Sequence, residues 1–316
     1  MQLQDPGELG RYAAAVAVFG GTPYGHVLSG SPSSLKRITR EEVAALHSTY
    51  YRPDNAVLVL SGDIEPEQGF ALAERTFGDW AAPAAPLPAT APVSPQVHPR
   101  VIVVDLPGAG QASVSVAMPA IARADSRFFS ALVANGTLGG GYSARLNEEI
   151  RIKRGLSYGA SSAIDARRFT GPFVAAAQTR NEAAPEVVQL LLAEIRRLGS
   201  APAGPDELTA RKATLTGTYG RGLETTQGLA QVLSTYALEN IPPSEISRYA
   251  GEVQAVTPEA AEAFAAEVLD PARADIIVVG DAKLFLPALR ASLPNLEVIP
   301  AADLDLDSPT LRKGAP

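Results

Sequence analysis

Apolar and polar residues in the first 80 positions follow helical and strand spacings that predict a helix, a strand and a second helix. Thr39-Arg-Glu-Glu is a capping signature that opens an amphipathic helix, which runs to Tyr51 and is stopped by Pro53. The apolar run 56–61 predicts a buried strand, and the pattern over 66–77 predicts another helix.

A proline-rich stretch interrupts this pattern. Residues 81–99 hold six prolines among nineteen positions, a composition that forbids helix and favours an extended, polyproline-like connector. It divides the chain into a short part, 1–80, and a long part that begins at residue 100.

The long part is predicted to contain strands first and helices later. Strands are expected at 101–104, 112–117, 157–165 and 172–178, and helices at 125–134 and 143–153 and from about 184, 206, 226 and 244, before a closing helix and strand. This order predicts an α+β fold, in which helices cover one face of a mainly antiparallel sheet. The complete unit is assigned to 100–300, and residues 301–316 form a tail that is surface-bound or frayed.

The closing helix and strand repeat the pattern of the short part at an offset of 218 residues. Seven identities occur in 25 aligned positions, and they include the proline stop and the Gly-Asp turn, Gly62-Asp63 against Gly280-Asp281. A shared stop and turn at matching offsets predict an internal repeat, and therefore two similar units.

The two copies differ in what precedes them. In the second copy 157 residues separate the linker from the repeated helix, whereas only 38 precede it in the first copy. We therefore expect about 119 residues of the first unit to be absent, so that 1–80 is the C-terminal part of a truncated unit. Because its strand near Val57 would lack neighbours, residues 100–300 alone are expected to be at least as soluble and as cooperative as the whole chain.

Composition narrows the range of functions. The chain is 46% hydrophobic and 19% charged, as in a soluble globular protein, and its formal net charge of −7 argues against a nucleic-acid partner. No apolar run approaches the roughly 18 residues that a membrane span requires. Cysteine is absent, which excludes disulfides, thiolate nucleophiles and cysteine-ligated zinc.

Histidine is equally scarce. His26, His47 and His98 lie far apart, and none has a second histidine or a carboxylate at the spacing that places ligands on one helical face. We therefore expect no metal site and no other cofactor within this chain.

One segment has a distinctive arrangement of glycines and polar residues. Gly139, Gly140 and Gly141 predict a tight turn, after which Ser143 is expected to cap a helix that Gly155 ends.

Two polar side chains flank the end of that helix. Arg151 at the helix end and Tyr158 at the start of the next strand would point into one space, where a guanidinium and a phenol can donate hydrogen bonds to an oxygen that gains charge. The same residue types are also ordinary at a helix C-terminus and at a strand edge, so the spacing alone does not demand a function.

Several motifs together resemble those of the pitrilysin/insulinase-type zinc peptidases, a family that includes the mitochondrial processing peptidases. Pro23-Tyr-Gly-His26, the run from Ile38 to Asn55 and Gly62-Asp63 look like the end of that family's first domain. Leu138-Gly-Gly-Gly141 and the run from Ser143 to Tyr158 look like its second domain.

The resemblance implies roles for residues of the second domain. The family places an Arg and a Tyr seven residues apart, here Arg151 and Tyr158, to hold substrate and to steady the tetrahedral intermediate. Gly139, Gly140 and Gly141 would belong to the substrate loop.

The resemblance also implies partners. The H-x-x-E-H zinc motif of active members lies in the first half of the first domain, so zinc is expected in the missing part or in a partner, within a homo- or heterodimer that encloses a peptide substrate. Two origins of the chain fit the sequence: a zinc-free subunit and a fragment of a longer chain. Two other roles stay open: a structural scaffold and a peptide-binding protein. Among compartments, the resemblance favours the bacterial periplasm.

Overall fold

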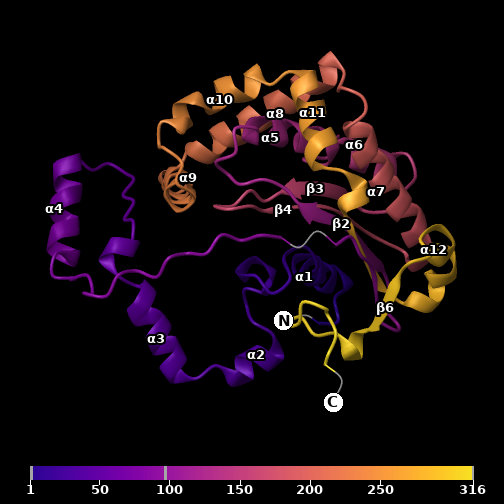
Figure 1. Ribbon diagram of the computed structural model, residues 1–316. Helices are drawn as coiled ribbons and strands as arrows, with labels where there is room; N and C mark the ends of the chain where they lie inside the picture. Colours follow the sequence, from indigo (N-terminus) through magenta and orange to yellow (C-terminus); the bar gives the residue numbers. More distant parts are fainter. Residues whose placement is uncertain (1–2, 96–97, 315–316) are drawn as a thin grey trace.

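The computed structural model describes residues 3–95 and 98–314, and its main body is a six-stranded sheet (Figure 1). The strands lie in the order β3-β4-β2-β5-β1-β6. Their bounds are β1 (Val101–Asp105), β2 (Ala112–Pro119), β3 (Ala160–Ile164), β4 (Pro172–Thr179), β5 (Asp275–Gly280) and β6 (Glu297–Pro300). The β3-β4, β4-β2 and β2-β5 pairs are antiparallel, whereas β5-β1 and β1-β6 are parallel. The predicted α+β fold with a mainly antiparallel sheet is confirmed.

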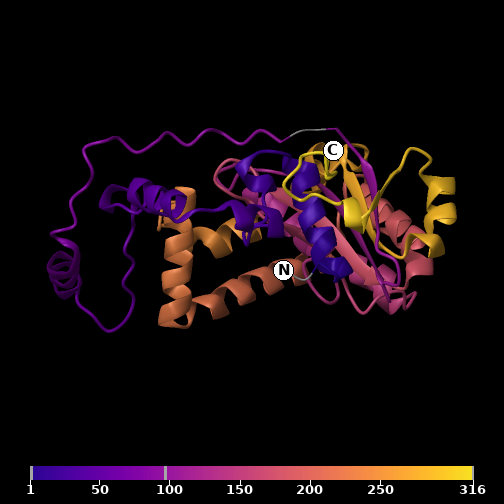
Figure 2. The same cartoon turned by 90° about the horizontal axis from the view of Figure 1, so that it is seen from below.

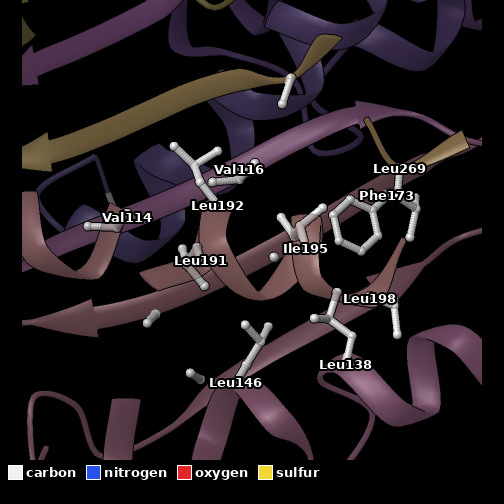
Figure 3. Packing of buried hydrophobic residues seen from close by; sticks show 14 of the residues in the cluster. Val114, Val116, Leu138, Leu146, Phe173, Leu191, Leu192, Ile195, Leu198 and Leu269 are labelled. Carbon is white, nitrogen blue, oxygen red and sulfur yellow. The ribbon is translucent and has the colours of Figure 1, made fainter. Parts of the chain in front are cut away.

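Helices of the long part lie on one side of this sheet (Figure 1). They are α5 (Phe128–Leu138), α7 (Ala184–Leu198), α8 (Pro205–Leu223), α9 (Thr226–Glu239), α10 (Glu245–Ala255), α11 (Pro258–Val268) and α12 (Leu286–Ser292). Helix α7 presents Leu191 and Ile195 to Val114 and Phe173 of the sheet, and all four side chains are fully buried (Figure 3). Burial of each such side chain stabilises the fold by about 1.5–3 kcal/mol. The side chains between these helices and the sheet form the main core.

The opposite face of the sheet is covered by α1 (Pro6–Phe19), which comes from the start of the chain. Its Leu9, Val16 and Phe19 are buried in a second core with residues of β1 and β5. The helix approaches β2 so closely that a Cβ on Gly10 would lie 2.8 Å from the Ser113 Oγ. The expectation that residues 100–300 alone are at least as soluble and as cooperative as the whole chain did not include this contact, in which α1 covers one apolar face of the sheet.

Residues 38–80, which we call the arm, stand apart from the sheet (Figure 1). Helices α3 (Arg40–Tyr50) and α4 (Pro66–Phe77) confirm the two predicted helices, and Thr39 forms the predicted capping box with Glu42. The predicted strand at 56–61 is wrong: this segment is extended but pairs with no strand in the described ranges. A strand needs a neighbouring strand, and within residues 3–95 and 98–314 none pairs with this segment.

The connector between the arm and the sheet runs without regular structure over residues 81–95 and 98–99 (Figure 2). Its beginning is held by Arg52, whose Nη1 donates to the Ala85 carbonyl at 2.8 Å and whose Nη2 donates to the Pro83 carbonyl at 3.3 Å. Val93, further along, is buried in the second core against α1. The connector is thus attached at both of its described ends.

Short helices and the tail complete the fold. The short helices are α2 (Pro32–Arg37), η1 (Pro23–Gly25), η2 (Pro53–Asn55), η4 (Asn181–Ala183), η5 (Pro271–Arg273), η6 (Ala282–Leu284) and η7 (Ala301–Asp303). Leu306 and Leu311 of the tail are buried, and Asp307 accepts a hydrogen bond from Ser31 beside α2 at 2.6 Å. Of the two alternatives for the tail, residues 301–314 are bound to the surface rather than frayed.

Among the helices of the described ranges, none combines the length and the apolar character needed to cross a bilayer.

Candidate substrate-binding site

The segment that joins α5 to β3, residues 139–159, is named here the site segment because it carries every candidate site residue. The sequence predicts one helix over 143–153, but the structure has a single α-turn, α6 (Arg145–Asn147), followed by the π-turn η3 (Glu148–Ile152). The Lys153 N–H donates to the Glu148 carbonyl, five residues back. Turns of this type are frequent at functional sites.

The predicted cap of this helix is also different. The side chain of Ser143 makes no capping bond, because its Oγ accepts a hydrogen bond from Arg211 of α8 at 2.8 Å. Gly155, at φ 61°, ends the turn as predicted, since this left-handed conformation favours glycine.

Two of the three candidate glycines are required for packing. A Cβ on Gly139 would lie 2.3 Å from the Ser162 nitrogen of β3, and one on Gly140 would lie 2.8 Å from the Gly136 Cα of α5. Gly141 faces open space. Gly139 and Gly140 therefore let the end of α5 approach the edge strand, and their contacts are explained by the fold.

The middle of the site segment is anchored in the core. Leu146 and Ile150 are fully buried, and Leu146 lies below α7 in the main core (Figure 3). Asn147, only 3% exposed, donates from Nδ2 to the Tyr142 carbonyl at 2.5 Å and accepts at Oδ1 from the Ala160 N–H at 3.2 Å. One amide thus ties the glycine turn to the start of β3.

Arg151 lies on η3, and its guanidinium carbon is 4.8 Å from the ring centroid of Tyr142. Within the described ranges, this guanidinium makes no hydrogen bond or ion pair. Tyr158 lies two residues before β3 rather than at its start, and 89% of it is exposed. No hydrogen bond or cation–π contact joins Arg151 to Tyr158 among the described residues, so the structure places them on one segment without such a link.

The loop before β3 holds Tyr158 at the surface. The Leu156 carbonyl accepts a hydrogen bond from the Thr179 Oγ1 of β4 at 2.6 Å, and Leu156 itself is buried. Ser157 closes a short turn by accepting from the Gly159 N–H at 3.0 Å. The exposure of Tyr158 is therefore imposed by a backbone that is fixed on both sides.

The outer edge of β3 is partly closed. The Ala160 N–H donates to Asn147 and the Ser162 N–H donates to the Gly139 carbonyl at 3.1 Å, so these two edge donors are already used. Three large side chains of the site segment are exposed: those of Tyr142, Ile152 and Tyr158.

Charged neighbours of Arg151 are paired. Arg145 makes two bonds of 2.9 Å to Glu207 of α8, and Lys153 and Arg154 both bind Glu149. These two cations hold the pKa of the Glu149 carboxyl below its usual value, chiefly through the hydrogen bond from Lys153.

Residues 37–215 match the family model described as the Peptidase M16 inactive domain. The chain belongs to this family. The match covers more than half of the chain and includes the whole site segment, so the family resemblance identified from the motifs is confirmed.

Curated relatives of this M16 chain are bacterial. It is 27% identical over 289 residues to an uncharacterized zinc protease of Streptomyces coelicolor, covering 90% of this chain and 62% of the relative. It is 28% identical over 276 residues to an uncharacterized zinc protease of Mycobacterium tuberculosis, covering 85% and 62%. The chain thus spans less than two thirds of the length of these relatives.

Solved structures share the fold. A peptidase M16 inactive domain from Pseudomonas fluorescens superposes with a TM-score of 0.80 at 26% identity, covering 88% of this chain and 66% of that one. A protease from Helicobacter pylori superposes with a TM-score of 0.78 at 18% identity, covering 85% and 64%. The second likeness concerns the fold alone.

The M16 resemblance implies zinc, but the described residues do not fit it. His26, His47 and His98 are all exposed, and His47 stacks on Tyr51 with ring centroids 4.9 Å apart. Across residues 3–95 and 98–314 no group of three histidines, cysteines, aspartates or glutamates is arranged to hold a metal ion. No chemical step is therefore assigned to zinc bound by these residues.

The sequence analysis did not single out two residues that contact the candidate site residues or fix the site segment, Tyr142 and Asn147. Tyr142 could have been noticed in the sequence, because it directly follows the glycine turn. Its contact with Arg151, which lies on the π-turn, is seen only in the structure. Asn147 could not have been noticed in this way, because its two partners lie 5 and 13 residues away and only the fold brings them together.

Proposed function

We propose that this chain serves as the substrate-binding, zinc-free part of an M16-type zinc peptidase. In this proposal Arg151 grips the peptide near the scissile bond, and Tyr158 donates a hydrogen bond to the oxygen that gains charge in the tetrahedral intermediate. Zinc comes from outside the described residues, either from an upstream region or from a zinc-bearing partner in a homo- or heterodimer.

The observation that carries the proposal is the exposure of Tyr158, together with a half-buried Arg151 whose guanidinium makes no hydrogen bond or ion pair among the described residues, on one segment that is anchored in the core. Tyr158 is 89% exposed, although the residues around it are held by hydrogen bonds and buried side chains. A tyrosine used for packing would lie in the core. The neutral phenol is an effective donor to an oxyanion, and the planar guanidinium can bind a carbonyl or carboxylate with two N–H groups.

A second observation supports the presence of another polypeptide segment that covers the arm. Thirteen large hydrophobic residues of the arm are exposed. They are Ile38, Val43, Leu46, Tyr50, Tyr51, Val57, Leu58, Leu60, Ile64, Phe70, Leu72, Phe77 and Trp80. Apolar surface of this extent is typical of a region that another protein segment covers. An upstream region or a partner subunit that covers the arm would bring its own residues toward this chain.

Peptide cleavage by the chain mixed with an excess of a zinc-bearing M16 partner tests this function. Tyr158→Phe removes only the hydroxyl, so kcat should fall by about 10²- to 10³-fold, the usual cost of one oxyanion donor, with little change in KM. Arg151→Lys keeps the charge and loses the planar fork, so it should also lower kcat/KM.

Arg154→Ala is the matched control. Arg154 lies on the same segment but pairs with Glu149 at the surface, and such pairs contribute little, so activity should be nearly unchanged. Near-normal activity of both Tyr158→Phe and Arg151→Lys would refute the substrate-binding role and favour a structural scaffold of the same fold.

A further inference from the structure

We propose that Tyr142 is a positioning residue for Arg151, whose guanidinium it holds against its ring so that the N–H groups stay available to a peptide. This inference rests on the proposed function of Arg151. It adds a third residue to the site and gives a reason for an exposed aromatic side chain after the glycine turn.

The way in which Arg151 is held differs from that of its neighbours. Arg145 donates two hydrogen bonds to the Glu207 carboxylate, and Arg154 donates to Glu149. The Arg151 guanidinium instead lies with its carbon 4.8 Å from the Tyr142 ring centroid and has no carboxylate or carbonyl partner among the described residues.

This difference matters for binding. A carboxylate would occupy the N–H groups of the guanidinium, whereas an aromatic ring attracts the cation through its π face. The N–H groups of Arg151 therefore remain without a hydrogen-bond acceptor among the described residues. A ring is thus the partner that orients an arginine without using the donors required for a substrate.

Tyr142 is itself fixed. The Asn147 side chain donates to its carbonyl at 2.5 Å, and this buried residue of α6 also accepts a hydrogen bond from the Ala160 N–H at the start of β3. The ring, however, is not a core residue, because Tyr142 is 66% exposed. A fixed backbone with an exposed ring fits a positioning role better than a packing role.

The contact can be tested in the chain alone. In NMR spectra of the isotope-labelled full chain, the Arg151 side-chain resonances should show a ring-current shift that Tyr142→Leu abolishes and Tyr142→Phe retains. Unchanged Arg151 resonances in Tyr142→Leu would overturn the contact. This readout needs no activity, so it is independent of the proposed function.

The functional consequence is tested with the zinc-bearing partner in excess. Tyr142→Leu should lower kcat/KM by about two- to fivefold, the size of an exposed cation–π contact, and Tyr142→Phe should restore it. With Arg151→Met, Tyr142→Leu should cost nothing more, whereas with Tyr158→Phe it should cost the same factor as in the parent chain.

Two results would contradict the inference differently. If Tyr142→Leu lowers kcat/KM in the Arg151→Met background by the same factor as in the parent chain, the ring contacts substrate directly and does not act through Arg151. If Arg151→Met itself leaves kcat/KM unchanged, the proposed function of Arg151 fails, and the NMR result then states separately whether the two side chains interact.

Discussion

Helices α3 and α11 have equal lengths, lie 218 residues apart and are each followed by a 3₁₀ turn, η2 or η5. Both begin with a threonine cap, Thr39 or Thr257. The surroundings of the two copies differ. Ala261 and Phe264 of α11 are 4% and 2% exposed against α5 and α7, whereas the matching Val43 and Leu46 of α3 are 55% and 57% exposed.

The segments that follow these helices differ still more. Ile276 and Val278 lie in β5, between β1 and β2, and are 5% and 0% exposed. The matching Leu58 and Leu60 are 52% and 43% exposed, in a segment that pairs with no described strand. Helices form from local hydrogen bonds in both copies, but a strand forms only where another strand lies beside it.

The largest expected effect comes from removing the cover of β5. In a chain shortened to residues 98–316, the loss of α1 exposes the apolar face formed by Ile277, Val279 and their neighbours. Helix α1 contributes five large buried side chains, so the loss is on the order of 10 kcal/mol, comparable with the whole stability of a domain. Thermal unfolding followed by circular dichroism should show no cooperative transition.

Removal of the arm is the matched control. Replacing residues 38–80 by a flexible glycine-serine segment removes exposed apolar side chains and leaves both cores intact. The melting temperature should change little, and solubility should rise. A large destabilisation from this change, or a normal melt of 98–316, would reverse the comparison between the two copies.

A pair of point substitutions tests the same contrast at matched positions. Phe264→Ala should destabilise the chain by about 3–5 kcal/mol, because it opens a cavity between α11 and α5. Leu46→Ala, 218 residues earlier, should change the free energy of unfolding by less than about 0.5 kcal/mol. Denaturant titration measures both, and equal effects would show that the arm is packed in solution.

Asp275 at the start of β5 provides a smaller effect that depends on pH. Burial raises the pKa of this carboxyl to about 6, despite a hydrogen bond from the Arg100 N–H. Since the native state then binds the proton more tightly than the unfolded state, stability should fall as pH rises from about 4 to 6. Asp275→Asn removes the charge, so it should stabilise the chain by about 1–3 kcal/mol at pH 8 and by little at pH 4. A pH-independent effect would contradict this.

Much of the fold could be predicted because its causes are local. Thr39 caps α3, Gly155 ends the turn after η3, and the apolar runs of β1, β2 and β4 coincide with their strands. The Arg151 and Tyr158 candidates came from a motif resemblance, and the structure adds that Tyr158 is exposed. Their catalytic roles stay predictions.

Other features were outside the reach of a pattern. The local sequence of α1 and of residues 56–61 does not specify whether a sheet lies beside them. Helix α1 is buried against the sheet, whereas residues 56–61 pair with none of its strands. The Asn147 bonds likewise depend on the Ala160 N–H of β3, and the π-turn η3 packs against α7, which is distant in the sequence.

The sequence by itself therefore determined where α3 begins and where the turn after η3 ends, because a cap and a glycine act through hydrogen bonds and backbone angles within a few residues. The tertiary structure alone decided which apolar run became a strand and which face of the sheet α1 covers. It also decided which ring lies beside the Arg151 guanidinium, because each of these depends on a neighbour that local sequence does not specify.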